Sequence, residues 1–160
     1  MTEKITDPAK TRKKAMDFLA RREHSRLELY QKLKQRQFEP DVINSELSKL
    51  LDEGLQSDER FAEAFLRSRI DKGKGPNIII LELSQRGVDE LLASNVIGSI
   101  SEEEWNDLAY RTMNKKLGNG AELDYDKQLK LMKFLSNRGF TRSQIEKAKN
   151  LLRQKFNRIK

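Results

Sequence analysis

Apolar residues recur along the chain at the spacing of an amphipathic helix, in three similar blocks of about fifty residues each. In each block, two apolar residues four positions apart precede an arginine, and two more follow it at matching distances. A spacing of four places both members of a pair on one face of a helix. The pairs before the arginine are Leu29 and Leu33, Ile79 and Leu83, and Leu131 and Leu135, and those after it are Ile43 and Leu50, Ala93 and Ile100, and Ile145 and Leu152. The pattern predicts three copies of one helical unit.

The arginine of each block lies in a short turn. Residues 35–39, 85–89 and 137–141 share the order polar, Arg, Gly or Gln, apolar, and then a residue typical of a helix start. Each turn is therefore expected to join two helices. The arginines Arg36, Arg86 and Arg138 come near the end of the preceding helix, where a cation complements the helix dipole and the last carbonyl groups.

Capping residues and prolines indicate where the helices begin and end. Ser25 with Glu28 forms a capping box, Pro40 suits a first helical position, and Gly54 is a typical terminator. Ile78 and its β-branched neighbours could form a strand, but the helical start at Pro76 favours a helix. The expected helices span residues 10–22, 25–36, 40–53, 58–71, 76–86, 89–97, 101–117, 124–138 and 141–156.

These elements predict an all-α protein, an elongated array of three tandem three-helix repeats. We expect a flexible tail over residues 1–9 and repeats over residues 10–54, 55–100 and 101–160. A single unit of this size is marginal alone, so neighbouring units are expected to bury surface against one another.

Composition adds information about partners and compartment. The chain has 160 residues, no cysteine, and a net charge of +7 with a sequence pI of about 9.6. An excess of positive charge favours a polyanion or an acidic protein surface as partner. The absence of cysteine suits a reducing compartment, and the sequence contains neither a signal-peptide core nor a membrane span. We expect a cytoplasmic monomer with no membrane partner.

Few residues suggest catalysis. His24 is the only histidine, and no constellation of metal-ligating or acid–base residues accompanies it, so packing beside the Ser25 cap or a surface position is favoured. The acidic residues from Glu102 to Glu104 fall in a first helical turn, where the helix dipole explains them. No phosphate-binding glycine motif occurs. We expect no enzyme activity, no cofactor and no small-molecule substrate.

Basic residues provide the candidate binding site. The loop from Lys72 to Gly75 leads into a helix start at Pro76, where it could hold a phosphate or simply act as a hinge with solvated lysines. Basic groups elsewhere could line one side of a curved array or be solvated faces. The candidate partner- or DNA-binding residues are Arg21, Arg22, Arg67, Arg69, Lys72, Lys74, Arg142, Lys149 and Arg153.

Four segments resemble the RecX family of bacterial recombination regulators. They are residues 22–29 (REHSRLEL), 54–62 (GLQSDERFA), 68–76 (SRIDKGKGP) and 134–140 (FLSNRGF). Their order and separation agree over nearly the whole chain. The chain departs from the family pattern at Gln37, where the other two turns have Gly, and at Lys74 and Asn77.

The resemblance implies tandem three-helix repeats and a partner, the RecA recombinase. It implies a non-enzymatic regulator, mainly an inhibitor, in the field of DNA repair and the SOS response. Such a protein would bind in the groove of the RecA–DNA filament, block its extension or promote its disassembly, and so lower ATPase, strand-exchange and coprotease activities. The alternative is a helical protein that binds DNA directly without sequence specificity and competes for it. An enzyme is a third possibility, which would need clustered ionisable residues in a pocket.

Overall fold

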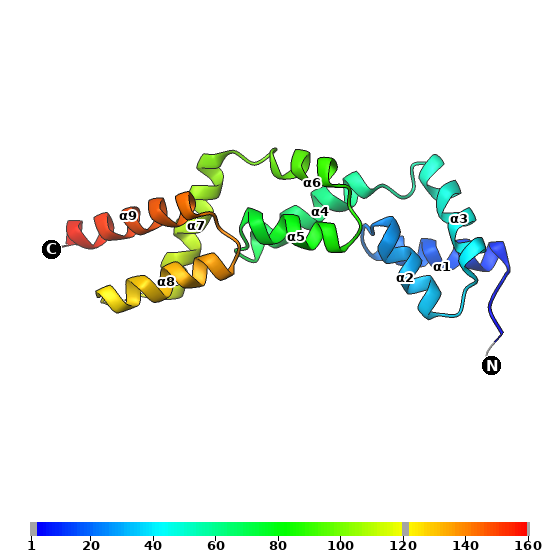
Figure 1. Cartoon of the computed structure of the whole chain (residues 1–160), viewed down its shortest axis with the longest axis horizontal. Helices are drawn as coiled ribbons and strands as arrows, with labels where there is room; N and C mark the ends of the chain where they lie inside the picture. Colours follow the sequence, from blue (N-terminus) through cyan, green and yellow to red (C-terminus); the bar gives the residue numbers. More distant parts are fainter. Residues whose placement is uncertain (1–2, 120–121, 160) are drawn as a thin grey trace. The chain divides into compact units, whose positions relative to one another are not determined.

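The structure is a computed structural model that describes residues 3–119 and 122–159 (Figure 1). Within these residues every regular element is a helix. The helices are α1 (Pro8–Arg21), α2 (Arg26–Gln35), α3 (Pro40–Asp52), α4 (Asp58–Asp71), α5 (Pro76–Gln85), α6 (Glu90–Ile97), α7 (Glu102–Leu117), α8 (Tyr125–Asn137) and α9 (Arg142–Ile159). The all-α prediction is confirmed. The segment 78–80 lies in α5, so the strand alternative is wrong.

The chain forms two compact units. The first comprises Met1–Phe65 with Leu83–Ala93, and the second comprises Leu66–Glu82 with Ser94–Lys160. Helices α1, α2 and α3 lie wholly in the first unit, and α7, α8 and α9 lie wholly in the second. The helices α4, α5 and α6 each contribute residues to both units.

The core of the first unit lies where α1, α2 and α3 meet. Its buried members alternate at spacings of three and four along each helix, as an amphipathic helix requires. They are Ala15 and Phe18 from α1, Leu29 and Leu33 from α2, Phe38 from the turn, and Ile43, Leu47 and Leu50 from α3. The apolar pairs that flank Arg36 therefore face one another across this core.

The core of the second unit forms where α7 packs against α8 and α9. Trp105, Leu108, Ala109 and Met113 face inward from α7, and the buried residues of α8 are Leu131 and Leu135. Phe140 in the turn and Ile145, Ala148 and Leu152 complete the set of buried apolar residues. The apolar pairs around Arg138 thus have the same role as those around Arg36.

Several predicted helix starts are confirmed. The Ser25 hydroxyl accepts a hydrogen bond from the Glu28 N–H, and the Glu28 carboxylate accepts one from the Ser25 N–H, both at 3.1 Å. At the start of α9, Thr141 and Gln144 form the same reciprocal pair at 2.9 and 3.2 Å. Pro40 begins α3. These bonds satisfy N–H groups that have no partner inside the helix.

The prediction of a loose tail over residues 1–9 is wrong for part of that segment. Asp7 caps α1 by accepting a bond from the Ala9 N–H at 2.9 Å, and the helix begins at Pro8. Ile5 forms an isolated parallel bridge with Phe38. Met1 and Thr2 of the expected tail lie outside the described residues. The signal missed was the Asp-Pro pair, which is a helix-start signature.

The three turns share a left-handed central residue. The φ angle is 71° at Gln37, 78° at Gly87 and 94° at Gly139. Glycine adopts this conformation without steric penalty, whereas a residue with a side chain does so at a cost of about 1–2 kcal/mol.

In each turn, backbone carbonyl groups accept hydrogen bonds from a segment that precedes the turn in the chain. The Gly75 N–H donates to the Arg138 carbonyl at 2.8 Å, and the Asn77 N–H donates to the Gly139 carbonyl at 2.9 Å. The Ser25 hydroxyl donates to the Arg86 carbonyl at 2.8 Å. In the first turn, the Ile5 N–H donates to the Gln37 carbonyl at 2.7 Å. Ile5 therefore bonds the first turn as Asn77 bonds the third.

Close approach explains which turns need glycine. A Cβ atom on Gly87 would lie 2.8 Å from the Leu27 Cβ, and one on Gly139 would lie 2.6 Å from the Ile78 Cβ, both far inside van der Waals contact. Gln37 is exposed. The glycines at 87 and 139 therefore allow two segments to touch. The departure from glycine at Gln37 falls on the turn that bonds the N-terminal segment at Ile5.

Replacing Gly87 with alanine should destabilise the protein more than replacing Gly54. Both glycines have nearly the same φ, 78° and 75°, but nothing lies within 4 Å of a Cβ added at Gly54. Gly54→Ala should therefore show the backbone penalty alone. Gly87→Ala should add about 1–3 kcal/mol of overpacking against Leu27. Urea unfolding followed by circular dichroism measures both. An equal decrease in the free energy of unfolding of the two variants would contradict the close contact between Gly87 and Leu27 as the reason for glycine at position 87.

Candidate functional site

Four of the nine predicted binding residues are held in ion pairs. Arg22 bonds both carboxylate oxygens of Glu28 at 3.1 Å. Glu82 receives Arg69 at 2.8 Å and Lys74 at 3.7 Å, and Lys149 lies 2.7 Å from Glu146. These carboxylates neutralise much of the charge that the sequence suggested for binding.

The other five predicted residues are exposed. Arg21 ends α1 in the first unit, whereas Arg67, Lys72, Arg142 and Arg153 belong to the second unit. No ion pair of these five occurs among the described residues. They come from four different segments, so the structure does not gather them into one site.

The backbone donors that the phosphate-binding interpretation of the Lys72–Gly75 loop requires at the start of α5 are engaged elsewhere. A phosphate at the start of α5 would use the N–H groups of Gly75 and Asn77. Both donate instead to the carbonyls of Arg138 and Gly139. A Cβ atom on Gly75 would come within 2.5 Å of the Gly139 carbonyl carbon, so the two backbones touch. Within the second unit, the loop therefore packs against the turn that contains Arg138 and Gly139.

The three turn arginines have a shared contact that the helix-dipole interpretation missed. The guanidinium carbon lies 4.7 Å from the Phe18 ring centre for Arg36, 4.6 Å from Phe65 for Arg86, and 5.0 Å from Phe134 for Arg138. Arg138 also donates to the Lys72 carbonyl at 2.9 Å. Each arginine is thus fixed over an aromatic face.

A basic cleft of about 580 Å³ opens in the second unit, between the loop that follows α4 and the helices α7 and α8. We call it the basic cleft. Basic side chains outnumber acidic ones in its lining, where Asp71 is the acidic residue. The cationic side chains that line it are Lys72, Arg111, Lys115, Lys116 and Arg138.

A smaller cleft of about 260 Å³ adjoins the basic cleft, because Lys116 and Phe134 line both. Its other lining residues are Leu117, Lys127, Lys130 and Leu131. Lys127, Lys130, Phe134 and Arg138 follow one another at spacings of three and four from the first turn to the C-cap of α8, and so lie along one face. We call these four residues the α8 row.

Phe134 organises the cations where the two clefts meet. The Lys116 ammonium lies 5.1 Å from the centre of the half-buried Phe134 ring, and the Arg138 guanidinium lies 5.0 Å from it. Arg111 is held differently, by Asp107 at 2.8 Å on an exposed part of α7.

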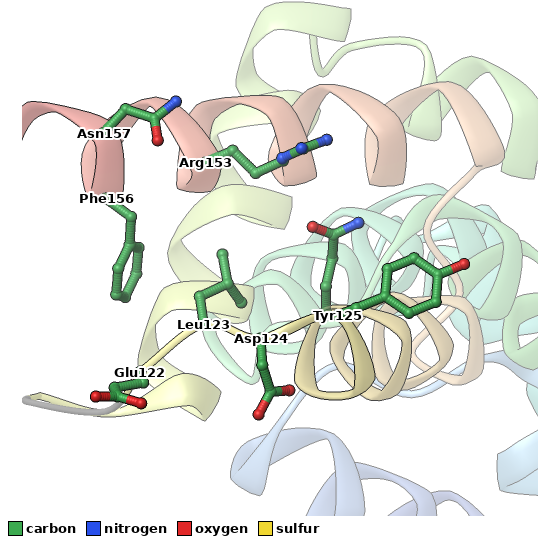
Figure 2. A pocket seen from close by; sticks show the side chains of 8 residues that line it. Glu122, Leu123, Asp124, Tyr125, Arg153, Phe156 and Asn157 are labelled. Atoms are coloured by element: carbon green, nitrogen blue, oxygen red, sulfur yellow. The ribbon is translucent and has the colours of Figure 1, made fainter.

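A third cleft, of about 580 Å³, contains the predicted residue Arg153. Arg153, Phe156 and Asn157 come from α9, and Glu122, Leu123 and Asp124 come from the segment that leads into α8 (Figure 2). Its charges are mixed, so it is a weaker candidate for a polyanion.

His24 is buried in the first unit rather than on the surface. Its Nδ1 lies 3.0 Å from the Arg22 carbonyl, and its Nε2 lies 2.8 Å from the Lys32 ammonium. The Nδ1 must therefore carry the proton, and the neutral ring accepts at Nε2. Burial, followed by the charges of Arg22 and Lys32, lowers the pKa of His24 below 6.5, although the Arg22 carbonyl opposes this.

Other site types have no support in the described part of the chain. Residues 3–119 and 122–159 contain no group of three or more His, Cys, Asp or Glu side chains that could hold a metal ion. Within the same residues, no helix is long and apolar enough to cross a membrane.

Three protein-family models match the sequence in order along the chain. Residues 12–50, 57–97 and 102–148 match the models of the first, second and third three-helix domains of RecX. The chain belongs to the RecX family.

Relatives and solved structures agree with the domain matches. The chain is 40% identical over 134 residues to the regulatory protein RecX of Halorhodospira halophila, covering 84% of this chain and 83% of the relative. It is 36% identical to the regulatory protein RecX of Pseudomonas putida, covering 91% and 92% of the two chains. The crystal structure of RecX from Lactobacillus salivarius matches with a TM-score of 0.79 at 25% identity, covering 92% of this chain and 97% of the other. The prediction of tandem three-helix repeats is confirmed, whereas the boundaries between them stay a prediction.

The basic cleft combines residues from two RecX domains. Lys72 falls in the second domain match, and Arg111, Lys115, Lys116 and Arg138 fall in the third. Sequence reasoning missed Arg111, Lys115, Lys116, Lys127 and Lys130. The spacing of three and four along residues 127–138 was a usable signal for the α8 row. That the cations of α7 and Lys72 in the loop after α4 line the same cleft could be learned only from the tertiary structure.

The stability of the protein should fall between neutral pH and pH 5.5 because of His24. The unfolded chain binds a proton on this histidine near pH 6.5, whereas the folded chain, with a lowered pKa, binds it only at lower pH. The stabilising contribution is therefore complete above pH 6.5 and is lost as pH falls toward the folded pKa. Urea unfolding at a series of pH values measures the slope.

A His24→Gln variant is the control for this pH dependence. Its unfolding free energy should change less between pH 7.5 and 5.5 than that of the parent. The pKa of Glu28 is also lowered, but from 4.5, so its effect falls in a more acidic range. Parallel slopes in the two proteins would show that His24 is not the titrating group.

Proposed function

We propose that this RecX-family protein regulates RecA, mainly as an inhibitor, by binding the RecA–DNA filament. The observation that carries the proposal is the match of all three RecX domains, in order, along the chain. Relatives that cover most of its length are named regulatory proteins. The protein acts by binding and needs no catalytic site of its own.

The proposed mode of action is insertion into the groove of the filament. A filament groove presents DNA phosphates and protein surface together, and a chain with a net charge of +7 is attracted to the phosphates at long range. Bound there, the protein blocks addition of RecA or promotes its loss. The ATPase, strand-exchange and coprotease activities of RecA then decline because each depends on an intact filament. We place this activity in the cytoplasm and expect a monomer.

A second candidate function is competition for DNA without recognition of RecA. The basic cleft favours it, because five cations line the cleft beside one carboxylate. The two functions differ in stoichiometry. Recognition of the filament requires far less protein than coating the DNA does.

The first test is a titration of the DNA-dependent ATPase of RecA with this protein at fixed ionic strength. Binding of the protein alone to the same DNA is measured in parallel. Filament recognition predicts inhibition well below the concentration that saturates the DNA. Inhibition only at DNA-saturating concentrations, relieved by added DNA, would replace the leading proposal with simple competition.

Charge reversal at Arg21 and Arg67 should weaken inhibition. Both side chains are exposed, and neither has an ion-pair partner among the described residues, so reversal leaves no carboxylate stranded. We expect the half-inhibitory concentration to rise about tenfold for the double variant, roughly 1.4 kcal/mol of binding. The matched control is Lys13→Glu with Lys147→Glu, which reverses two exposed lysines and changes the net charge equally. Unchanged inhibition by a folded Arg21→Glu, Arg67→Glu variant would remove these residues from the interface.

A further inference from the structure

The basic cleft has an excess of positive charge even after Arg111 is paired with Asp107. Elsewhere, Glu82 neutralises Arg69 and Lys74, and Glu28 neutralises Arg22. Within the basic cleft, Asp71 is the carboxylate beside five cations, and Asp107 pairs with Arg111 outside the lining. The lysines at 72 and 115 are exposed, with no ion pair in the described part of the chain. Concentrated positive charge in a concave surface raises the local concentration of an anion.

Two of these cations are held in place before any ligand arrives. Arg138 donates to the Lys72 carbonyl at 2.9 Å and lies over the Phe134 ring. Lys116 lies over the same ring. A side chain that is already ordered loses less conformational entropy on binding. An arginine in a fixed orientation can also offer paired donors to a phosphate.

The α8 row extends the positive surface in one direction. Lys127 and Arg138 are eleven positions apart, which corresponds to about 16 Å along a helix. A stacked nucleic-acid strand rises about 3.4 Å per nucleotide along its helix axis, so the row spans the rise of at most roughly four or five nucleotides. This length is comparable to the smallest sites of single-strand binding folds, about four nucleotides.

The aromatic ring beside the cations favours a single strand over a duplex, because only an unpaired base can stack on a side chain. The basic cleft, of about 580 Å³, has the volume of a small-molecule site and is large enough for one nucleotide. Phe134 is half-buried and lines both clefts, and Lys116 and Arg138 lie over its ring, so a base would meet the part of the ring that these cations leave exposed. Base stacking on an aromatic ring is tolerant of sequence.

We propose that the basic cleft and the α8 row together form a binding site for single-stranded nucleic acid, with the cations on the phosphates and Phe134 beside a base. This proposal rests on the function proposed above, because the nucleic acid that the site would contact is the DNA of the RecA–DNA filament. The contact would be made by the second unit. An acidic protein segment is the alternative ligand. The cations of the two clefts and the Phe134 ring together suit a strand that carries both phosphates and bases, whereas an acidic peptide offers carboxylates alone.

The test is fluorescence anisotropy of a labelled oligothymidine of about 15 nucleotides with the full chain, in the absence of RecA, over a range of salt concentrations. The variant Lys115→Gln with Lys130→Gln removes one exposed cation from each cleft. We expect affinity to fall about tenfold. The slope of log affinity against log salt should become shallower by about 0.7 for each phosphate contact removed.

Two further variants make the test specific. The control Lys147→Gln with Arg158→Gln removes the same charge from exposed positions of α9 outside both clefts, and its salt slope should equal that of the parent. Phe134→Leu retains an apolar side chain but removes the ring, so affinity should fall a few-fold while the salt slope stays nearly constant. Thermal unfolding shows whether each variant is folded.

The outcomes separate the site from the function. Equal losses in the cleft variant and the α9 control would mean general charge attraction and overturn the site, as would equal affinity for duplex and single strand. A cleft variant that binds oligothymidine normally but no longer binds RecA filaments would assign the cleft to an acidic protein surface. Cleft-dependent oligothymidine binding without any inhibition of RecA by the parent would retain the site and overturn the function.

Discussion

The structure depends on one repeated interaction, the docking of a turn's carbonyl groups onto donors at the start of an earlier segment. Gly75 and Asn77 supply N–H groups to the third turn, Ser25 supplies a hydroxyl to the second, and Ile5 supplies an N–H to the first. Hydrogen bonds this short bring backbones together, so a side chain at Gly87 or Gly139 would overlap its neighbour. The same docking removes the start of α5 as an anion site, because its donors are already used.

The distribution of charge follows from where carboxylates can reach. In α5, Glu82 lies close enough to neutralise both Arg69 and Lys74, two of the nine binding residues predicted from the sequence. The cations of α7 and α8 face a cleft that contains Asp71 alone among carboxylates. Net charge is a sum over the whole chain, whereas local pairing decides which cations remain available to a partner. The nucleic-acid site proposed above therefore lies on the second unit.

Much of the fold was predictable because local rules agreed with one another. The pairs Leu29 and Leu33, and Leu131 and Leu135, mark the buried faces of α2 and α8, and the Ser25 cap fixes the start of α2. Prediction failed at Ile5, because a single parallel bridge has no periodicity that a sequence can display. It failed again for the basic cleft, whose lining comes from a loop, from α7 and from α8.

The sequence by itself determined the helices, their caps, the threefold repetition and the net positive charge, because each depends on residues only a few positions apart or on a simple sum. Only the tertiary structure decided which glycine has no room for a side chain, which arginine forms an ion pair and which lysines line the same cleft. These properties depend on distances between residues far apart in the chain, such as Arg138 and Lys72. Packing sets those distances, and no local pattern of residues encodes them.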